Sequence, residues 1–455
     1  MEIKVISKEI IKPSSPTPPH LGKFTLSIFD QFVPLVYCPL LFFYSCRNDN
    51  LKIEDKLAKL KDSLSKTLTR FYPLAGRIKD QRTVDCNDEG VLYVVAQVNH
   101  EMYNFLEAPN SRTLTHLVIP YQPICEGPPE LVPQLTIQVN LFACGGMAIG
   151  LCVLHKIIDA YTVTSFVKSW AALARGTCDH VDKEELVYDR NLVPSLFPPN
   201  ERLVYDAQAS FWSSTSMTDA EDPRRFVFDA TAISSLKAKA RSEQVPNPTR
   251  TEAVISFVWK SALKASRLLY SSQKQSVVFS AINLRSRLSP PLPDRSIGNV
   301  VLRGVAHYTT TTTAEMELQH LVGLLRQSVA KVDSDYINKL KGETGHEEFR
   351  KRREELAKIY SEIPPNFMFE ASSALNMGFY EGNFGWGKPV WFGEASLSEK
   401  MNKNSILLVE APNADDVEVW ITLNKHQMGI VEKDPEFLSY ATPNPPIISN
   451  KDPKI

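Results

Sequence analysis

Several sequence patterns that usually identify an enzyme's chemistry are missing from this chain. The 455 residues contain no Gly-rich phosphate-binding loop, no G-x-S-x-G turn, no H-E-x-x-H motif and no G-x-G-x-x-G fingerprint. Nucleotide-hydrolysing, serine hydrolase, zinc peptidase and dehydrogenase functions are therefore disfavoured. None of the 7 cysteines forms a C-x-x-C pair, so a zinc cage or a redox couple has no support either. An isolated acid–base group is the chemistry that remains.

An excess of one charge and a long apolar run are also missing. The 51 Lys and Arg nearly balance the 52 Asp and Glu, so no long-range field would draw the chain to nucleic acid or to an anionic membrane. The most apolar stretch, residues 32–44, is too short to span a bilayer and contains Pro34 and Pro39. The N-terminus lacks a signal-peptide core, and the cysteines are scattered. These features predict a cytoplasmic protein without membrane insertion.

The length and the pattern of elements predict two domains of mixed α/β type. A chain of 455 residues is longer than one hydrophobic core usually supports. Strand-like and helix-like segments alternate in both halves, whereas the periodicity fades between residues 188 and 223 and Pro, Ser, Asn and Asp accumulate there. We therefore expect an N-terminal lobe at residues 1–187, a crossover loop at 188–223 and a C-terminal lobe at 224–455.

The local periodicity indicates where the main elements lie. Strands are predicted at residues 3–11, 135–141, 148–154, 225–229 and 277–284, with two short ones within 84–98. Helices are predicted at residues 57–71, 162–175, 232–242, 251–269 and, as a solvated helix, 339–358.

The main candidate for chemistry is a histidine at the end of a buried strand. Residues 148–154 are almost uniformly apolar, as in a strand covered on both faces, and His155 follows directly. A histidine there can face a cleft, and an unperturbed pKa of about 6.5 suits it to take a proton from an alcohol. Asp159 completes an H-x-x-x-D spacing. The spacing alone favours a plainer interpretation, a histidine bonded to backbone with Asp159 capping the following helix.

A second unusual string is N-F-G-W-G at residues 383–387, followed by Lys388 and Pro389. Two glycines flanking Trp386 indicate a tight backbone that needs positive φ or a close approach. By itself this string predicts a structural turn around a packed tryptophan.

Together these strings resemble a known family. H-x-x-x-D at 155–159 and N-F-G-W-G at 383–387 resemble the H-x-x-x-D and D-F-G-W-G signatures of the plant BAHD acyltransferases. The similarity spans essentially the whole chain, and the branch that it resembles most holds vinorine synthase, salutaridinol acetyltransferase and the volatile-ester alcohol acyltransferases. Other matching strings are I-K-P-S-S-P-T-P at 11–18, F-Y-P-L-A-G-R at 71–77, V-D-C-N-D at 84–88, S-F-V-W-K at 256–260, N-L-R at 283–285 and G-N at 298–299.

The resemblance implies two chloramphenicol-acetyltransferase-like lobes with mixed sheets, joined by a long crossover loop and separated by a solvent channel. It implies that His155 is the general base, taking the acceptor's proton during direct attack on an acyl-CoA thioester without an acyl-enzyme. Asp159 is implied to be structural and paired with Arg285. The turn with Asn383 and Trp386 is implied to lie away from the chemistry.

The resemblance also implies the reactants. We expect acyl-CoA, with acetyl-CoA as the first choice, as co-substrate and a hydroxyl of a plant specialised metabolite as acceptor. We expect no permanently bound cofactor, no metal and no nucleic-acid partner, and a monomeric protein.

The chain departs from the family pattern in three places. Asn383 replaces the leading Asp of the turn, which keeps the shape but loses a charge and typically costs about 1–3 kcal/mol. Where many relatives carry Thr-Ser-Trp, this chain has Ser-Ser-Ala from Ser372 to Ala374, so Ser372 is the remaining oxyanion candidate. Leu154 stands where a small polar residue usually precedes the histidine.

Binding of CoA requires cationic or hydroxyl partners for its phosphates. Thr249 and Arg250 precede a predicted helix, whose first N–H groups favour anions, and the family places CoA contacts near this region. A helix cap with a solvated arginine accounts for the two residues equally well.

Two other functions stay open. The same fold could acylate an amine, because His155 would serve either nucleophile; condensation-type enzymes usually carry two adjacent histidines, and Leu154 occupies the first of those places. A non-catalytic metabolite-binding relative is suggested by Asn383 and the missing Trp. The intact His155, Asp159 and Arg285 argue against that second alternative.

Overall fold

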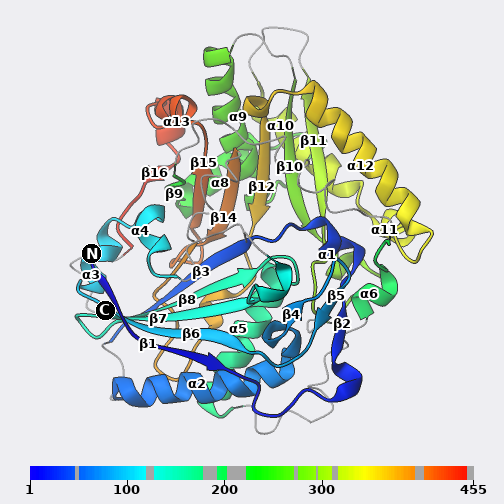
Figure 1. The fold of residues 1–455 in the computed structure, drawn as a ribbon. Coiled ribbons are helices and arrows are strands. Elements are labelled where there is room, and N and C mark those ends of the chain that lie inside the picture. Colours follow the sequence, from blue (N-terminus) through cyan, green and yellow to red (C-terminus); the bar gives the residue numbers. More distant parts are fainter. Residues whose placement is uncertain are drawn as a thin grey trace.

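Two large β-sheets, each with helices packed against it, form the computed structural model of the chain (Figure 1). The structure describes residues 1–46, 51–118, 128–177, 192–201, 222–270, 275–293, 296–309, 316–394 and 404–447. Within these residues the first half of the chain supplies most of a 6-stranded sheet and the second half supplies a 7-stranded sheet. The predicted α/β fold with two mixed-sheet lobes is thereby confirmed.

The first sheet has the strand order β1-β6-β7-β8-β3-β13. Its strands are β1 (Ile3–Ile11), β6 (Val91–Val98), β7 (Leu135–Phe142), β8 (Met147–Leu154), β3 (Tyr37–Tyr44) and β13 (Trp391–Glu394). Strands β6 and β7 run parallel, and the other neighbours run antiparallel. Every residue of β8 is buried, as expected of a nearly uniform apolar strand inside a covered sheet. The strands predicted for this sheet are confirmed.

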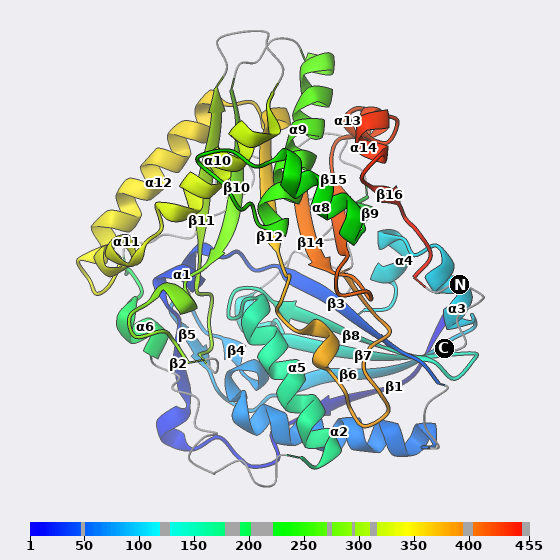
Figure 2. The ribbon, with the colours of Figure 1, turned by 180° about the vertical axis from the view of Figure 1, so that it is seen from behind.

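Helices α2 (Ile53–Arg70) and α5 (Ala160–Arg175) pack against each other and cover the first sheet (Figure 2). The indole Nε1 of Trp170 on α5 donates a 3.0 Å hydrogen bond to the Leu60 carbonyl on α2. Helix α5 ends at Gly176, whose φ of 69° is the left-handed conformation that favours glycine. Both helices were predicted, although α2 begins four residues earlier than its leucine periodicity indicated.

The second sheet has the strand order β11-β10-β12-β14-β15-β9-β16. Its strands are β11 (Val301–Thr309), β10 (Gln275–Asn283), β12 (Met368–Ser373), β14 (Ser405–Glu410), β15 (Val417–Thr422), β9 (Arg224–Phe228) and β16 (Thr442–Pro443). Strands β10, β12 and β14 run parallel to one another, and the remaining neighbours are antiparallel.

Helices cover the second sheet unequally on its two faces (Figure 2). Helix α9 (Arg250–Tyr270) lies on one face, where Trp259 donates from Nε1 to the hydroxyl of Ser276 on β10. The charged helix α12 (Gly345–Glu362) lies on the opposite face, where Tyr360 stacks on Phe279 of β10 with ring centroids 5.1 Å apart. Helices that pack on α9 are α8 (Ala230–Lys239), α10 (Leu318–Ala330) and α13 (Lys425–Val431).

Shorter elements complete the described part of the chain. They are β2 (Lys23–Thr25), β4 (Arg77–Ile78), β5 (Thr83–Asp85), α1 (Ile28–Phe32), α3 (Met102–Glu107), α4 (Ser111–Thr115), α6 (Leu192–Leu196), α11 (Ser334–Lys339) and α14 (Pro435–Leu438). The two strands predicted within residues 84–98 are β5 and β6, but they belong to different sheets, because β5 pairs with β2 and β4. Most of the predicted crossover at 188–223 lies outside the described residues. Among the described helices, none combines the length and apolar character that a membrane crossing requires.

One strand from the second half of the chain joins the first sheet. Strand β13 pairs with β3, with Trp391 opposite Phe43, and the Val390 N–H donates to the Phe43 carbonyl at 2.7 Å. The predicted C-terminal lobe at 224–455 therefore contributes a strand to the sheet of the other lobe. This added strand connects the two halves next to the N-F-G-W-G segment.

Candidate active site

His155 lies in the turn that follows β8, where the first sheet meets the second half of the chain. Its main-chain N–H donates to the Val36 carbonyl at 2.8 Å, and its carbonyl accepts a 2.8 Å hydrogen bond from Nδ2 of Asn299. The residue is half-buried, and its Nδ1 is shielded from solvent without a hydrogen-bond partner among the described residues. The backbone of His155 is thus fixed from both halves of the chain.

Asp159 caps helix α5 and pairs with Arg285 from the other half of the chain. Its Oδ1 accepts from the Thr162 N–H at 3.0 Å, and its Oδ2 accepts from the Val300 N–H at 3.1 Å. The Arg285 guanidinium binds both oxygens, at 2.6 and 3.1 Å. Burial opposes ionisation of this carboxyl, but the Arg285 charge and these hydrogen bonds outweigh it and hold the pKa of Asp159 below its ordinary value.

Arg285 joins the end of β10 to the His155 loop. Besides Asp159, its Nη2 donates to the Ser296 and Gly298 carbonyls at 3.3 and 3.1 Å. The guanidinium carbon lies 4.8 Å from the centre of the Tyr161 ring. Among the described residues, the hydrogen bonds of Asp159 do not include one to His155. The Asp159–Arg285 pair is therefore a structural bracket that connects the His155 loop to the other half of the chain. The pairing of Asp159 with Arg285, expected from the family resemblance, is present in the geometry.

Three further residues, Asn299, Asp30 and Lys156, are connected to the position of His155, and sequence reasoning assigned them no role. The Asp30 carboxylate accepts from the main-chain N–H of Asn299 at 2.7 Å and from its Nδ2 at 2.8 Å. Lys156 is 1 % exposed and donates from Nζ to the Gln31 carbonyl at 3.0 Å. The S-x-x-D spacing at residues 27–30 indicates a helix cap. Nothing in that spacing shows that the cap is buried beside residue 155.

One face of the second sheet is accessible to solvent on β10, the strand that precedes Arg285. Ala281 on β10 and Ser372 on β12 are exposed, although both strands have a neighbour on each side. The register pairs Ser280 with Ala371, so Ala281 and Ser372 lie side by side, on the face opposite α9. This end of β10 leads within a few residues to Arg285. Solvent therefore reaches this face of the second sheet, and Ser372 lies on it.

The N-F-G-W-G turn lies against the first sheet. The Asn383 side-chain oxygen accepts from the N–H groups of Gly385 and Gly387 at 2.9 and 3.2 Å, and both glycines have positive φ near 110°. Phe384 meets Trp170 edge to face, and Trp386 meets Tyr44 in the same way. An acceptor oxygen is all that the turn requires at residue 383, which explains how Asn replaces Asp without loss of the local geometry.

Thr249 and Arg250 stand at the start of α9. Thr249 exchanges hydrogen bonds with Glu252, from Oγ1 to Oε2 at 2.9 Å and from the Glu252 N–H to Oγ1 at 3.1 Å. Arg250 donates from Nη2 to the Asn376 side chain at 2.6 Å and from Nη1 to the Ala414 carbonyl at 3.1 Å. Thr249 is therefore a helix cap in this state, and Arg250 is tied to the loop that follows β12.

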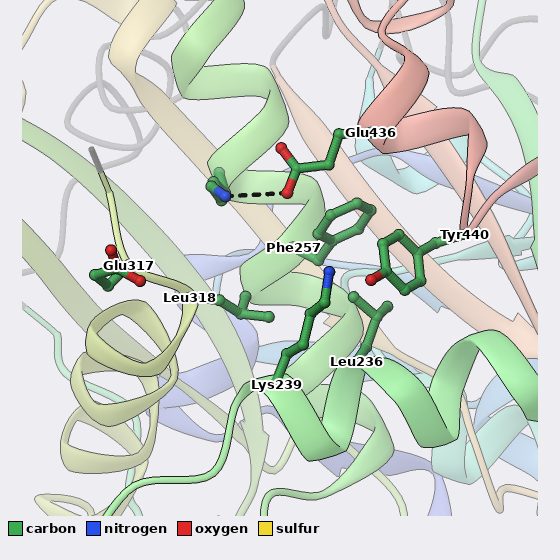
Figure 3. Close-up of a pocket in the computed structure, with 8 residues that line it drawn as sticks. Leu236, Lys239, Phe257, Glu317, Leu318, Glu436 and Tyr440 are labelled. Carbon is green, nitrogen blue, oxygen red and sulfur yellow. Dashed lines mark hydrogen bonds and ion pairs between the residues drawn. The ribbon is translucent and has the colours of Figure 1, made fainter.

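A separate pocket lies on the outer helices of the second sheet (Figure 3). It is lined by Leu236, Lys239, Phe257, Lys260, Glu317, Leu318, Glu436 and Tyr440. Lys260 pairs with Glu436 at 3.2 Å, and the Lys239 Nζ lies 5.0 Å from the centre of the Tyr440 ring. The charges around this pocket compensate one another, and none of the lining residues belongs to the His155 loop or its bracket.

Sequence comparison finds close relatives over the whole chain. The family model described as Transferase family matches residues 1–438. Akuammiline synthase 2 of Alstonia scholaris is 36% identical over 456 residues, covering 99% of both chains. A limonoid 7-O-acetyltransferase of Citrus sinensis is 35% identical, with 98% of this chain and 99% of the relative covered. Stemmadenine O-acetyltransferase of Catharanthus roseus is 32% identical, with 96% and 97% covered.

Structural comparison gives the same picture. The crystal structure of vinorine synthase matches with a TM-score of 0.81 and 29% identity, covering 98% of this chain and 100% of that one. The TRI101 protein of F. sporotrichioides, solved with coenzyme A and T-2, matches with a TM-score of 0.71 at 18% identity, covering 92% of this chain and 99% of that one. The second likeness concerns the fold alone, and it agrees with the two-lobed architecture described above.

Proposed function

The chain belongs to this Transferase family, the BAHD acyl-CoA-dependent acyltransferases, and from that premise we propose that it esterifies a hydroxyl of a plant specialised metabolite, with His155 as the general base. The observation that carries the proposal is the state of His155. Its main chain is held by Val36 and Asn299, and its Nδ1 has no hydrogen-bond partner among the described residues.

The proposed reaction is a direct transfer between acyl-CoA and the acceptor alcohol. The neutral imidazole of His155 takes the hydroxyl proton as the oxygen attacks the thioester carbonyl, and a tetrahedral oxyanion forms. When the intermediate collapses, the carbon–sulfur bond breaks and the imidazolium returns the proton to the CoA sulfur. The products are an ester and free CoA, so atoms and charge balance without an acyl-enzyme.

Two further groups are proposed for the ligands. The Ser372 hydroxyl on the accessible sheet face would donate to the oxyanion, because a fixed donor there stabilises the charge that develops. Arg250, and Thr249 beside it, would contact a CoA phosphate at the N-terminus of α9. Arg250 would then exchange its present contacts with Asn376 and Ala414 for the phosphate.

The nature of donor and acceptor is proposed from the relatives. Limonoid 7-O-acetyltransferase and stemmadenine O-acetyltransferase are named for transfer of an acetyl group to an oxygen. We therefore favour acetyl-CoA as donor and a hydroxyl of a terpenoid or alkaloid skeleton as acceptor. We also propose that the protein works as a monomer in the cytoplasm, where its cysteines stay reduced.

The experiment incubates the full chain with acetyl-CoA and matched panels of polycyclic alcohols and amines. We expect one free thiol released per ester formed, an ester as product by mass spectrometry, and an unchanged intact protein mass during turnover. Amide products without esters would overturn the assignment of the acceptor. An acetylated protein that passes its acetyl group to the alcohol would overturn direct transfer, and no release across the panel would favour a binding function.

A further inference from the structure

Asp30 is a second carboxylate buried next to the His155 loop, and the reaction proposed above does not use it. It occupies the first turn of α1 and is 1 % exposed. Burial raises the pKa of this carboxyl, while hydrogen bonds from Asn299 and Ser27 act in the opposite direction. Burying a carboxyl group costs free energy unless hydrogen bonds compensate for the lost water. The donors around Asp30 therefore indicate which parts of the chain it holds in place.

Both oxygens of Asp30 are occupied by hydrogen bonds. Oδ2 accepts from the main-chain N–H and the hydroxyl of Ser27, at 2.8 and 2.7 Å, which closes a capping box on α1. Oδ1 accepts from the main-chain N–H and Nδ2 of Asn299, at 2.7 and 2.8 Å. Asp30 therefore fixes Asn299 at two points, and Asn299 belongs to the opposite half of the chain.

Asn299 passes this restraint to His155. A side-chain amide carries two hydrogens, and the Asn299 Nδ2 donates to Asp30 and to the His155 carbonyl, the latter at 2.8 Å. Gly298 precedes Asn299 with a φ of 123°, a backbone conformation that residues with a Cβ rarely adopt. The path from the carboxylate to the main chain of His155 thus consists of two hydrogen bonds.

Lys156 holds the other side of the same turn. It follows His155 directly, and its Nζ donates to the carbonyl of Gln31, the residue after Asp30. Burial lowers the pKa of Lys156 to about 8, and the charge of Asp30 counteracts this effect. Helix α1 therefore holds the turn at two points, through Asn299 at His155 and through the lysine at the next residue.

We propose that Asp30 is a positioning residue for His155, acting through Asn299, with Lys156 as its buried counter-charge. Asp30 contacts neither reactant in this scheme. Because Asn299 comes from the second half of the chain, the imidazole is aligned only when the two halves are docked. The inference rests on the proposed function of His155 as the base, and it adds a residue in the first helix to the parts that the reaction depends on.

The test replaces Asp30 by Asn, which keeps the size but replaces one of the two acceptor oxygens by an NH2 group, so that either Ser27 or Asn299 faces a donor where it now has an acceptor. We expect kcat to fall roughly 10- to 100-fold, because a base that is displaced by a fraction of an ångström loses much of its effect. The KM for acetyl-CoA should stay within about twofold, because Asp30 is not a ligand contact in this scheme. Asn299→Ala, which removes the relay itself, should give the same pattern and serves if Asp30→Asn folds poorly.

The matched control is Glu418→Gln, another acid-to-amide change at a fully buried carboxyl, which lies in β15. Both variants are assayed well below their melting temperatures. If Asp30→Asn loses stability but keeps its kcat, as we expect of Glu418→Gln, Asp30 is merely structural and the inference is wrong. The His155→Ala variant distinguishes failure of the proposed function from failure of the positioning role. If His155→Ala stays active, the proposed function is wrong. If His155→Ala is inactive but Asp30→Asn is fully active, only the positioning role of Asp30 is wrong.

Discussion

The Asp159–Arg285 and Glu418–Arg225 pairs are both buried carboxylate–guanidinium contacts. Asp159 and Arg285 have side chains that are 4 % exposed, at a distance of 2.6 Å. Glu418 and Arg225 have side chains that are 0 % and 3 % exposed, at 2.8 Å. The first pair lies beside His155 and connects the two halves directly. The second lies within the second sheet and reaches the first sheet through the Trp391 indole, which donates to Glu418 at 3.2 Å.

The two carboxyls nevertheless differ in their ionisation. Burial opposes the charge of both, but the pKa of Asp159 is lowered below its ordinary value, while burial raises the pKa of Glu418 in spite of Arg225. Asp159 receives two guanidinium nitrogens and two main-chain N–H groups. Glu418 forms an ion pair with one guanidinium nitrogen and accepts hydrogen bonds from two indole N–H groups. The number and the charge of the donors thus determine whether the pKa of a buried carboxyl is lowered or raised.

The largest effect on stability is expected from Asp159→Ala. The change leaves the Arg285 charge buried without its partner and removes the α5 cap, so the free energy of unfolding should fall by about 3–5 kcal/mol. Denaturant titration measures this loss, and activity should fall with the folded fraction or through a displaced loop. A stable, well-folded variant that fails only in chemistry would show that the structural assignment of Asp159 is wrong.

A smaller effect is expected from Glu418→Gln, about 1–3 kcal/mol, with kcat within about twofold of the native value. Since the folded pKa of Glu418 lies above its unfolded value, its contribution is present at acidic pH and is lost as the pH rises through the folded pKa. The stability difference between native protein and variant should therefore shrink from mildly acidic to alkaline pH.

Asp159 should show the opposite dependence in the same titration. Its folded pKa lies below the unfolded one, so its contribution persists at neutral pH and is lost only as the pH falls through the folded pKa. Parallel pH profiles of the two variants would contradict the contrast between the pairs.

The smallest effect is expected from Asn383→Asp in the turn. Either side chain offers the oxygen that accepts from Gly385 and Gly387, and the added charge would face Arg175, which already donates to the residue 383 carbonyl. The site is partly exposed, so the change should be neutral or stabilise the fold by at most about 0.5 kcal/mol. A clear drop in melting temperature would mean that the amide has a role of its own.

The features that followed from the sequence were those encoded within short segments. The apolar run before His155 predicted β8, and the family resemblance pointed to the contact between Asp159 and Arg285. The charge clusters built from distant segments were missed. Asp30 meets Asn299, and Arg225 meets Glu418, across long stretches of chain, and each acid looks like an ordinary surface residue in its local sequence. Burial of a charge is decided by tertiary packing, which local periodicity does not record.

The central claim is that the imidazole at residue 155 moves the proton, and one rate measurement tests it most directly. CoA release is followed at saturating acetyl-CoA and acceptor for His155→Ala and for His346→Ala, a control whose Nε2 contacts the Pro198 carbonyl near α12. The account predicts a loss in kcat of roughly 10²- to 10⁴-fold for His155→Ala with unchanged melting behaviour, and native rates for the control. A His155→Ala protein that turns over at the native rate would contradict it.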